Sequence, residues 1–254
     1  MGKMDVNCLI GHWPFRKLGK NTLPDLFKIH SENGITAGCV SSLNSIFYND
    51  PLEGEAELHA AIKGTAGYSH IATVNPTLTS SRYDLTKCVK LYPVKGVRIY
   101  PGYHGYLLSD PCVSALCDKL EQLNLPLFLT LRMEDERLDY LMTPRVLPMD
   151  ELKAFISAHT KLRVILLNIR TYEITDCVDV LKHPNVFFDT SGFGYEQFNV
   201  EKYVAEFGPG KQVYGSLYPL NCLKSSILQV EKADLSDKIK QQIFYDNAQL
   251  ALNG

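Results

Sequence analysis

Short apolar runs alternate with longer amphipathic segments along the whole chain. Eight runs are five residues long, rich in β-branched and aromatic residues, and nearly continuous in their apolar character rather than alternating. They cover residues Val6–Ile10, Ala37–Ser41, Ile71–Asn75, Gly96–Tyr100, Leu127–Leu131, Val164–Asn168, Val186–Thr190 and Gln212–Ser216. Because strands that are buried on both faces have this pattern, the runs predict a parallel sheet.

The segments between these runs have the period of amphipathic helices. They include Leu23–Asn33, Glu53–Lys63, Tyr83–Leu91, Pro111–Leu123, Met149–His159 and Val200–Phe207. Asp110-Pro111 is typical of a helix start, and Asn33-Gly34 is typical of a helix end. Eight βα units close a barrel, so we predict the α/β class and a single (β/α)8 TIM barrel that occupies residues 1–254 as one domain.

An open, doubly wound sheet is the alternative architecture. It is disfavoured because the turn after the first run reads GHWPFR and lacks the glycine spacing of a dinucleotide-binding turn. The length of 254 residues also matches the roughly 250 residues of a typical barrel of this kind.

Composition narrows the expected partners and location. The 26 basic and 28 acidic residues give a net charge of -2 without a basic run, so we expect no nucleic acid and no membrane surface as partner. We therefore expect a small molecule as the substrate or ligand. The chain has no signal-peptide core and no long apolar stretch, and its seven cysteines are scattered without a C-x-x-C pair. These features predict a cytoplasmic protein with reduced thiols.

Reactive groups of such a barrel lie at the carboxyl ends of the strands and in the loops that follow. The residues that we expect to bind substrate there are Asn7, Trp13, Arg98, Tyr100, Arg132, Asn168, Arg170, Ser216 and Tyr218. If Arg98, Arg132 and Arg170 converge, their guanidinium groups favour a carboxylate or phosphate ligand. The alternative is that each arginine pairs with a local carboxylate such as Asp135 or Asp189.

Proton transfer has four candidate residues. His12 and His104 lie in loops of the expected catalytic face, although each is equally typical of a hydrogen-bonded loop histidine. Asp135 and Asp189 follow the fifth and seventh strands. The run RMEDER over 132–137 supplies paired carboxylates or, alternatively, a salt-bridged rim. The remaining histidines are expected on helices or helix-to-strand connections in structural roles: His30, His59, His70, His159 and His183.

Seven sequence segments, in this order, resemble the amidohydrolase-related branch of the amidohydrolase superfamily. They read DVNCLIGHWPFR, VKGVRIYPGYHGY, LPLFLTLRMEDER, VILLN, FFDTSG, VYGSLYP and DNAQLAL. The resemblance implies a TIM barrel of the metal-dependent hydrolase type. It also implies one or two divalent metals, held by a His-x-His pair on the first strand, histidines on the fifth and sixth strands and an aspartate on the eighth.

The corresponding positions carry other residues in this chain: Asn7, Leu9, Thr130, Asn168 and Leu217. None of these is a strong ligand for a divalent metal, so we expect no metal at the usual position and no cofactor. The alternative is a divalent metal such as zinc at a non-standard site, for which His12, His104, Asp135 and Asp189 are the candidate ligands.

Two functions remain open. The first is a hydrolase or a decarboxylase-like lyase that holds a small anionic substrate in a deep polar pocket at the barrel mouth. The second is a non-catalytic barrel that binds small molecules or other proteins. The aromatic segment Phe193–Phe198 is a possible homodimer patch, or else a cover for the end of the seventh strand.

Overall fold

The computed structural model describes residues 2–135, 137–138, 142–194 and 196–254, with Arg82 and Tyr83 described in their backbone only. All eight predicted strands are present and form one parallel sheet in the order β1 to β8. The bounds are β1 Met4–Ile10, β2 Ala37–Ser42, β3 Tyr68–Thr73, β4 Val94–Ile99, β5 Leu127–Thr130, β6 Val164–Leu167, β7 Val186–Asp189 and β8 Gln212–Val213. The predicted single (β/α)8 TIM barrel is confirmed, and the open sheet is excluded.

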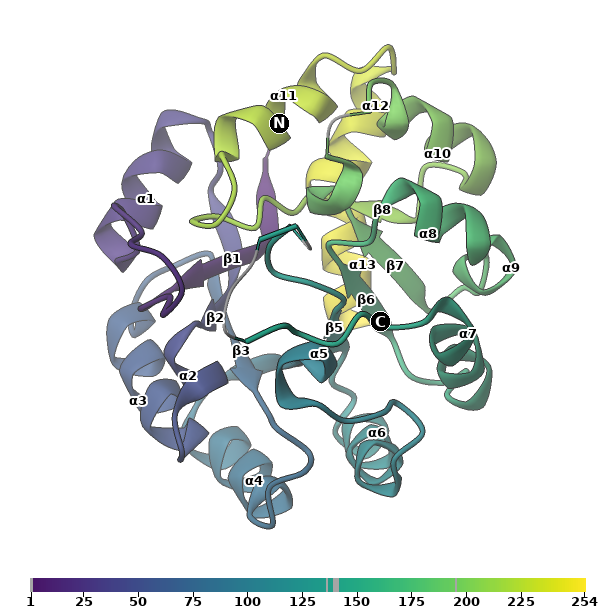
Figure 1. Cartoon of the computed structure of the whole chain (residues 1–254). Coiled ribbons are helices and arrows are strands. Elements are labelled where there is room, and N and C mark those ends of the chain that lie inside the picture. The colour runs from purple at the N-terminus through teal and green to yellow at the C-terminus, as the bar shows by residue number, and fades with distance from the viewer. Residues whose placement is uncertain (1, 136, 139–141, 195) are drawn as a thin grey trace.

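The first strand also bonds to the chain that follows the last strand. The amide of Val6 donates to the carbonyl of Tyr214, and the amide of Leu9 donates to the carbonyl of Tyr218, each at 2.9 Å. These bonds bring the two edges of the sheet together, so that the strands form the central ring that Figure 1 shows inside the circle of helices.

A bulge in β1 decides which of its side chains enter the barrel. Asp5 and Cys8, three residues apart, pair with the two ends of the segment Gly38–Val40 in β2, so β1 carries one additional residue. Val6 packs in the apolar interior and Asn7 bonds to a side chain inside the ring, whereas Asp5 and Cys8 face the helices. Strict alternation would have placed Asn7 on the outer side.

Helices follow each of the eight strands, and most of them cover the outside of the ring (Figure 1). Their bounds are α1 Leu23–Glu32, α2 Asn44–Phe47, α3 Pro51–Ile62, α4 Ser81–Leu91, α5 Pro101–His104, α6 Pro111–Leu123, α7 Met149–Ala158, α8 Thr171–Asp176, α9 Val178–Leu181, 3-10 helix η1 Ser191–Phe193, α10 Asn199–Phe207, α11 Leu223–Glu231, α12 Asp237–Gln241, π-helix η2 Gln242–Asp246 and α13 Asn247–Asn253.

Local signals place several of these boundaries. Asp110 is the N-cap of α6 with Pro111 in the first turn, and Asn33 ends α1 before Gly34, as predicted. The short helices α8 and α9 and the carboxyl-terminal helices were not identified from the apolar period. His70 lies within β3, so its expected place on a connection was wrong; it still faces the helices and contacts Glu55 at 2.6 Å.

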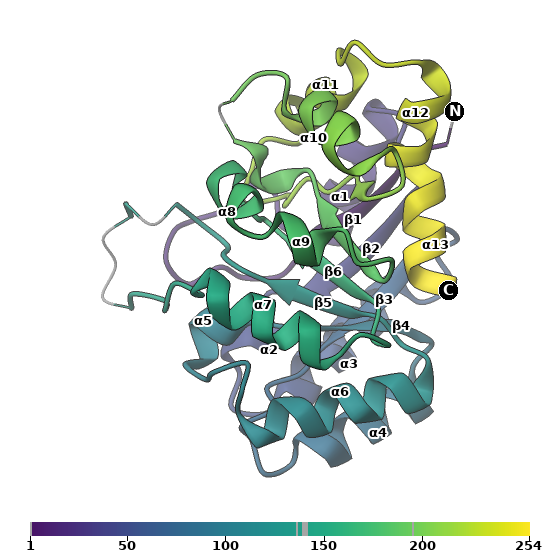
Figure 2. The same cartoon turned by 90° about the vertical axis from the view of Figure 1, so that its right-hand side faces the viewer.

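The apolar core has two parts, one inside the barrel near the amino ends of the strands and one between the strands and the helices. Val6, Phe128, Ile165 and Phe187 point inward near the amino ends of their strands. Helix α13 closes this end through Ala248 and lies on the side of the barrel opposite to α5 (Figure 2). A larger cluster fills the space between strands and helices. Among the described helices, none is long and apolar enough to cross a membrane.

The aromatic segment after β7 divides between core and surface. Phe193 is 1% exposed and packs against Phe188 and Tyr203, so it covers the end of β7 as the alternative interpretation held. Phe198 is 72% exposed, and Tyr195 lies outside the described residues. The homodimer patch stays a prediction. All seven cysteines are free thiols, and five of them are buried.

Gly192 has no room for a side chain where the turn after β7 approaches the turn after β6. An added Cβ would meet the carbonyl oxygen of Ile169 and lie 2.6 Å from the carbonyl carbon of Asn168. We expect Gly192→Ala to lower the free energy of unfolding by about 1–3 kcal/mol in urea titrations. Gly19→Ala, which has nothing within 4 Å, is the control. Equal losses for both variants would contradict the close approach.

Candidate functional site

A layer of polar side chains crosses the barrel interior near the carboxyl ends of the strands. Its members are nearly or fully buried, with exposed fractions of 0–3%, and come from six different strands: Asn7, Ser41, Thr73, Arg98, Thr130 and Asp189. Four of the nine expected substrate-binding residues and one of the four expected catalytic residues are close to this layer or in it: Asn7, Arg98, Tyr100, Asn168 and Asp189. The structure therefore brings together residues that lie up to 182 positions apart.

The carboxylate of Asp189 connects three strands within this layer. Its Oδ2 accepts hydrogen bonds from Asn7 Nδ2 and Ser191 Oγ, both at 2.7 Å, and its Oδ1 accepts from the amide of Asn168 at 2.8 Å. Burial raises the pKa of Asp189 to about 6, while these three donors and the positive charge of Arg98 oppose the rise. A carboxyl group with this pKa exchanges a proton near neutral pH.

Arg98 is a buried cation without a close counter-ion. It is 1% exposed, its Nε donates to Thr130 Oγ1 at 2.8 Å, and its Nη2 contacts Met133 Sδ at 3.6 Å. The guanidinium also lies over the Tyr100 ring, 5.0 Å from the centroid. No carboxylate of the described residues lies within 4.0 Å of it. Burial lowers its pKa, and the charge of Asp189 opposes that effect from a longer distance.

The amide oxygen of Asn7 in this layer is buried and has no hydrogen-bond partner among the described residues. Hydrogen bonding with Thr73 and Ser41 opposes the rise that burial causes in the pKa of Tyr100, so these three hydroxyl groups lie together. Buried polar groups are nearly always paired in proteins, so an unpaired amide oxygen in a buried polar layer is typical of a ligand or water site.

An apolar plug covers this layer on the mouth side. Leu9, Trp13, Leu43, Ile46, Tyr100, Met133, Leu217 and Leu220 form the plug, and all of them are buried. Trp13 comes from the loop between β1 and α1, and its indole Nε1 donates to Glu134 Oε2 at 2.8 Å. Glu134 also accepts from Arg16 Nε, so a single carboxylate fastens this loop to the loop after β5.

A hollow of about 100 Å³ lies beside the plug on the same face of the barrel. Phe15, Tyr103, Leu131 and Pro144 give it mainly apolar walls, and Arg132, Glu134 and Asp135 are the charged residues next to β5. The expected deep polar pocket is therefore divided in two: an accessible hollow that is largely apolar, and a polar layer that the plug separates from solvent.

The two candidate histidines do not join the polar layer. His12 is exposed, and its backbone amide donates to Asn44 Oδ1 at 2.7 Å. His104 is half-buried in α5, with Nε2 3.0 Å from the carbonyl of Ile46, and burial lowers its pKa. Their catalytic roles stay predictions.

Two of the three candidate arginines form local ion pairs. Arg132 bonds to Glu173 and to the carbonyl of Asn168, and Arg170 Nη2 lies 3.6 Å from Asp135. Asp135 also pairs with Arg137, and that contact holds the pKa of the Asp135 carboxyl well below its usual range. The alternative of a salt-bridged rim is thus confirmed for the described part of the RMEDER run; its Glu136 lies outside the described residues.

Ser216 and Tyr218 face the outer side of the barrel. The amide of Ser216 donates to Asp5 Oδ1 at 3.0 Å, and its hydroxyl bonds to Asp5 Oδ2. Asp5, Cys8 and His30 have ligand atoms within 4.8 Å of one another and are the group of described residues that could hold a metal ion. Sequence reasoning missed this group, because the β1 bulge that puts Asp5 and Cys8 on one face has no sequence signal.

A model of the amidohydrolase family matches residues 71–252, which is well over half of the chain. The chain belongs to the amidohydrolase family. The chain also resembles solved structures along almost its whole length. The sequence identities are low, so this similarity shows the fold alone. No curated protein sequence matches it.

Three of the similar structures are informative. An uncharacterised TIM-barrel protein from Bordetella bronchiseptica has a TM-score of 0.80 at 13% identity, covering 99% of this chain and 98% of that one. A 2,6-dihydroxybenzoate decarboxylase from Rhizobium gives 0.74 at 14% identity, with coverage of 99% and 98%. A dihydroxybenzoic acid decarboxylase from Polaromonas sp. JS666, with bound manganese and 2-nitroresorcinol, gives 0.74 at 14%, with coverage of 99% and 96%. The expectation that the protein binds no metal therefore has no support from its relatives.

The residues at the barrel mouth do not fit the metal that the family resemblance implies. Leu9 and Leu217 are fully buried in the apolar plug and offer no ligand atom. Thr130 accepts a hydrogen bond from the Arg98 guanidinium, which places a positive charge where a ligand would be needed. No catalytic step is therefore assigned to a metal at this position.

The raised pKa of Asp189 predicts a dependence of stability on pH. Because the folded pKa of about 6 lies above the ordinary 3.8, the native state holds this proton more tightly than the unfolded state. The stability that this provides is fully present below about pH 4 and is lost as the pH rises through 6. In urea unfolding between pH 4 and 7, we expect wild type to lose about 2 kcal/mol relative to Asp189→Asn.

Asp150→Asn removes a carboxylate whose side chain is 97% exposed and serves as the control. Its stability profile should run parallel to that of wild type over the same pH range. A parallel profile for Asp189→Asn as well would mean that the buried carboxyl titrates at its ordinary pKa.

Proposed function

We propose that the protein is an amidohydrolase-family enzyme, a hydrolase or a decarboxylase-like lyase, that acts on a small anionic organic substrate. The reaction takes place in the polar layer at the carboxyl ends of the strands, without a divalent metal at that position. The observation that carries this proposal is the buried guanidinium of Arg98, which has no carboxylate within 4.0 Å among the described residues and lies near the titratable Asp189.

Arg98 binds the anionic group of the substrate. Leaving a buried cation without a counter-ion is costly, so a substrate carboxylate that replaces the missing partner gains more there than in water. The Nη1 group has no hydrogen-bond partner among the described residues and is available for a second bond. Asn7 Oδ1 supplies a further unpaired polar atom that orients the remainder of the substrate.

Asp189 moves the proton. In a hydrolytic reaction its ionised form takes a proton from the attacking water, and in a decarboxylation its neutral form gives a proton to the carbon that loses carbon dioxide. Both forms are populated near neutral pH because the pKa is about 6. Asn7 and Ser191 fix the orientation of the carboxyl group through their bonds to Oδ2.

Access to this layer requires the plug to open. The hollow beside β5 is the entry point, and Met133 lies in sequence between its lining residues Arg132 and Glu134 while its sulfur contacts Arg98. A methionine side chain adapts easily to a new arrangement, and the loop that carries Trp13 is held to Glu134 by hydrogen bonds.

The plug favours a second candidate function. Leu9, Trp13 and Leu217 pack together and are at most 1% exposed. Such a closed mouth is typical of a non-catalytic barrel that serves as a binding or interaction module. In that case the hollow is the ligand site, and Arg98 and Asp189 only balance each other's charge. Variants of Arg98 and Asp189 distinguish the enzyme from the binding module, because only the enzyme needs these residues for ligand binding and turnover.

Replacement of Arg98 tests the anionic substrate. We expect small carboxylates, screened as benzoate, hydroxybenzoates and short dicarboxylates, to raise the Tm of wild type. Arg98→Met keeps the bulk but removes the charge, so affinity for the best binder should fall about 100-fold in calorimetry. Arg163→Met is the matched control, because Arg163 is also buried but lies at the amino end of β6.

Turnover of the best binder is then followed with and without a chelator, with circular dichroism on the same samples. Asp189→Asn should lower the rate at least 100-fold. If no carboxylate binds wild type, or if Arg98→Met binds as well as wild type, the proposal fails and the second function is favoured. Turnover that the chelator abolishes in a folded protein would contradict a reaction without metal.

The contact between Glu134 and the loop after β1 controls opening of the plug. Glu134→Gln removes the charge that holds Arg16, so the loop should open about tenfold more often. Trypsin cleavage after Arg16 or Lys17 measures this opening without a ligand. Glu206→Gln removes an exposed carboxylate paired with Lys182 and should leave the cleavage rate unchanged. Equal cleavage rates for both variants would show that Glu134 does not fasten the loop.

A further inference from the structure

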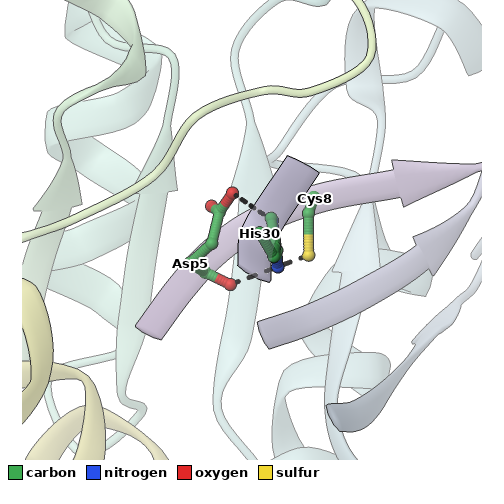
Figure 3. Close-up of side chains that lie close together, drawn as sticks. All are labelled: Asp5, Cys8 and His30. Atoms are coloured by element: carbon green, nitrogen blue, oxygen red, sulfur yellow. Dashed lines mark hydrogen bonds and ion pairs between the residues drawn. The ribbon is translucent and has the colours of Figure 1, made fainter. Parts of the chain in front are cut away.

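A second group of reactive side chains lies outside the barrel mouth, between β1 and α1. Asp5, Cys8 and His30 are each 0% exposed, and their ligand atoms all lie within 4.8 Å of one another. Figure 3 shows the three side chains close together, with the His30 ring between the Asp5 carboxylate and the Cys8 sulfur. We propose that these residues bind a zinc ion that joins the first strand to the first helix.

The β1 bulge creates the strand half of this site. Residues three apart on a regular strand point to opposite faces, but the additional residue between Asp5 and Cys8 turns both side chains toward α1. His30 lies in the last turn of α1 on its buried face and completes the group. Two ligands from one strand and one from a helix thus meet through the fold alone.

The position of the His30 ring fits a metal better than a direct hydrogen bond. Its Nε2 lies 3.4 Å from Asp5 Oδ2, which is longer than an ordinary N–H···O bond, and has no hydrogen-bond partner among the described residues. The distance agrees with the edge of about 3.3–3.4 Å of a tetrahedron whose metal–ligand bonds are 2.0–2.1 Å. The other ring nitrogen, Nδ1, lies 3.0 Å from the hydroxyl of Tyr68, which fixes the ring in this orientation.

The carboxylate is held in a similar way. Asp5 Oδ1 accepts from the amides of Asn7 and Ser216, both at 3.0 Å, so the side chain cannot rotate freely. Each carboxylate oxygen has two lone pairs, and Oδ2 keeps one for a metal while it bonds to the Ser216 hydroxyl. Ser216 therefore supports the metal ligand Asp5 instead of the substrate.

The chemistry of the three ligands selects zinc. Nitrogen, sulfur and carboxylate oxygen together suit a borderline divalent ion, whereas magnesium and calcium prefer oxygen alone. Without metal, the Cys8 thiol donates to the carbonyl of Cys39 at 3.2 Å. When Zn²⁺ binds, the S–H bond breaks, the sulfur forms a bond to zinc and the proton leaves to solvent, so binding weakens at low pH. No substrate reaches a site at 0% exposure, and the role of the ion is structural.

The test uses the full chain after removal of bound metal by a chelator and dialysis. Zn²⁺ or Co²⁺ is added, excess ion is removed, and the retained metal is counted by plasma mass spectrometry. We expect one ion per chain, a thiolate-to-cobalt charge-transfer band for Co²⁺, and a rise in Tm of about 5–10 °C at a zinc concentration 100 times the Kd. Cys8→Ser and His30→Gln should lose all three signals.

Matched variants separate this site from the barrel mouth. Cys117→Ser, another fully buried thiol, and Asp189→Asn, the polar group of the mouth, should both retain the ion. Retention by Cys8→Ser and His30→Gln together with loss in Asp189→Asn would overturn the proposal and place the metal at the mouth. Less than a tenth of an ion per wild-type chain would overturn it as well. Circular dichroism of every variant shows whether it is folded, and Cys8→Ser changes only one atom.

Discussion

The joining of β1 to the end of the sheet is the constraint on which the other features depend. The strand bonds to β2 on one side and to the chain after β8 on the other, and it carries one additional residue relative to β2. This bulge turns Asn7 into the barrel, where it meets Asp189, and turns Asp5 and Cys8 outward toward His30. The candidate reaction site and the candidate zinc site are therefore two faces of the same irregular strand.

Inside the ring, a charged layer is enclosed between apolar layers. Arg98 and Asp189 lie between the interior cluster near α13 and the plug around Trp13, and neither has a direct ion-pair partner among the described residues. In a medium of low polarity the two charges still influence each other at longer range, which is why each affects the pKa of the other. A layer of this kind is unfavourable for a purely structural barrel, because an apolar layer of the same volume would cost less. That cost is the physical reason for assigning a ligand to it.

Much of the fold follows from the apolar pattern, and a smaller part of the site does. The sequence placed Arg98, Arg132 and Arg170 equally at strand ends, but Glu173 and Asp135 pair with the last two and leave only Arg98 without a carboxylate. The glutamate follows Arg132 by 41 positions, and no local spacing reveals that contact. Family resemblance likewise indicated which ligand positions had changed, but it did not reveal that leucines at two of them form a plug.

The sequence by itself determined the eight strands, their parallel arrangement and the face on which polar residues collect, because burial on both sides of a strand leaves a direct mark on local composition. Only the tertiary structure decided which of those residues are neighbours. Ser216 was expected at the mouth and instead holds Asp5 on the outer side, while His30, expected to be structural only, faces Cys8. These outcomes depend on the register between strands that are distant in the chain, and a shift of one residue reverses the direction of every side chain that follows.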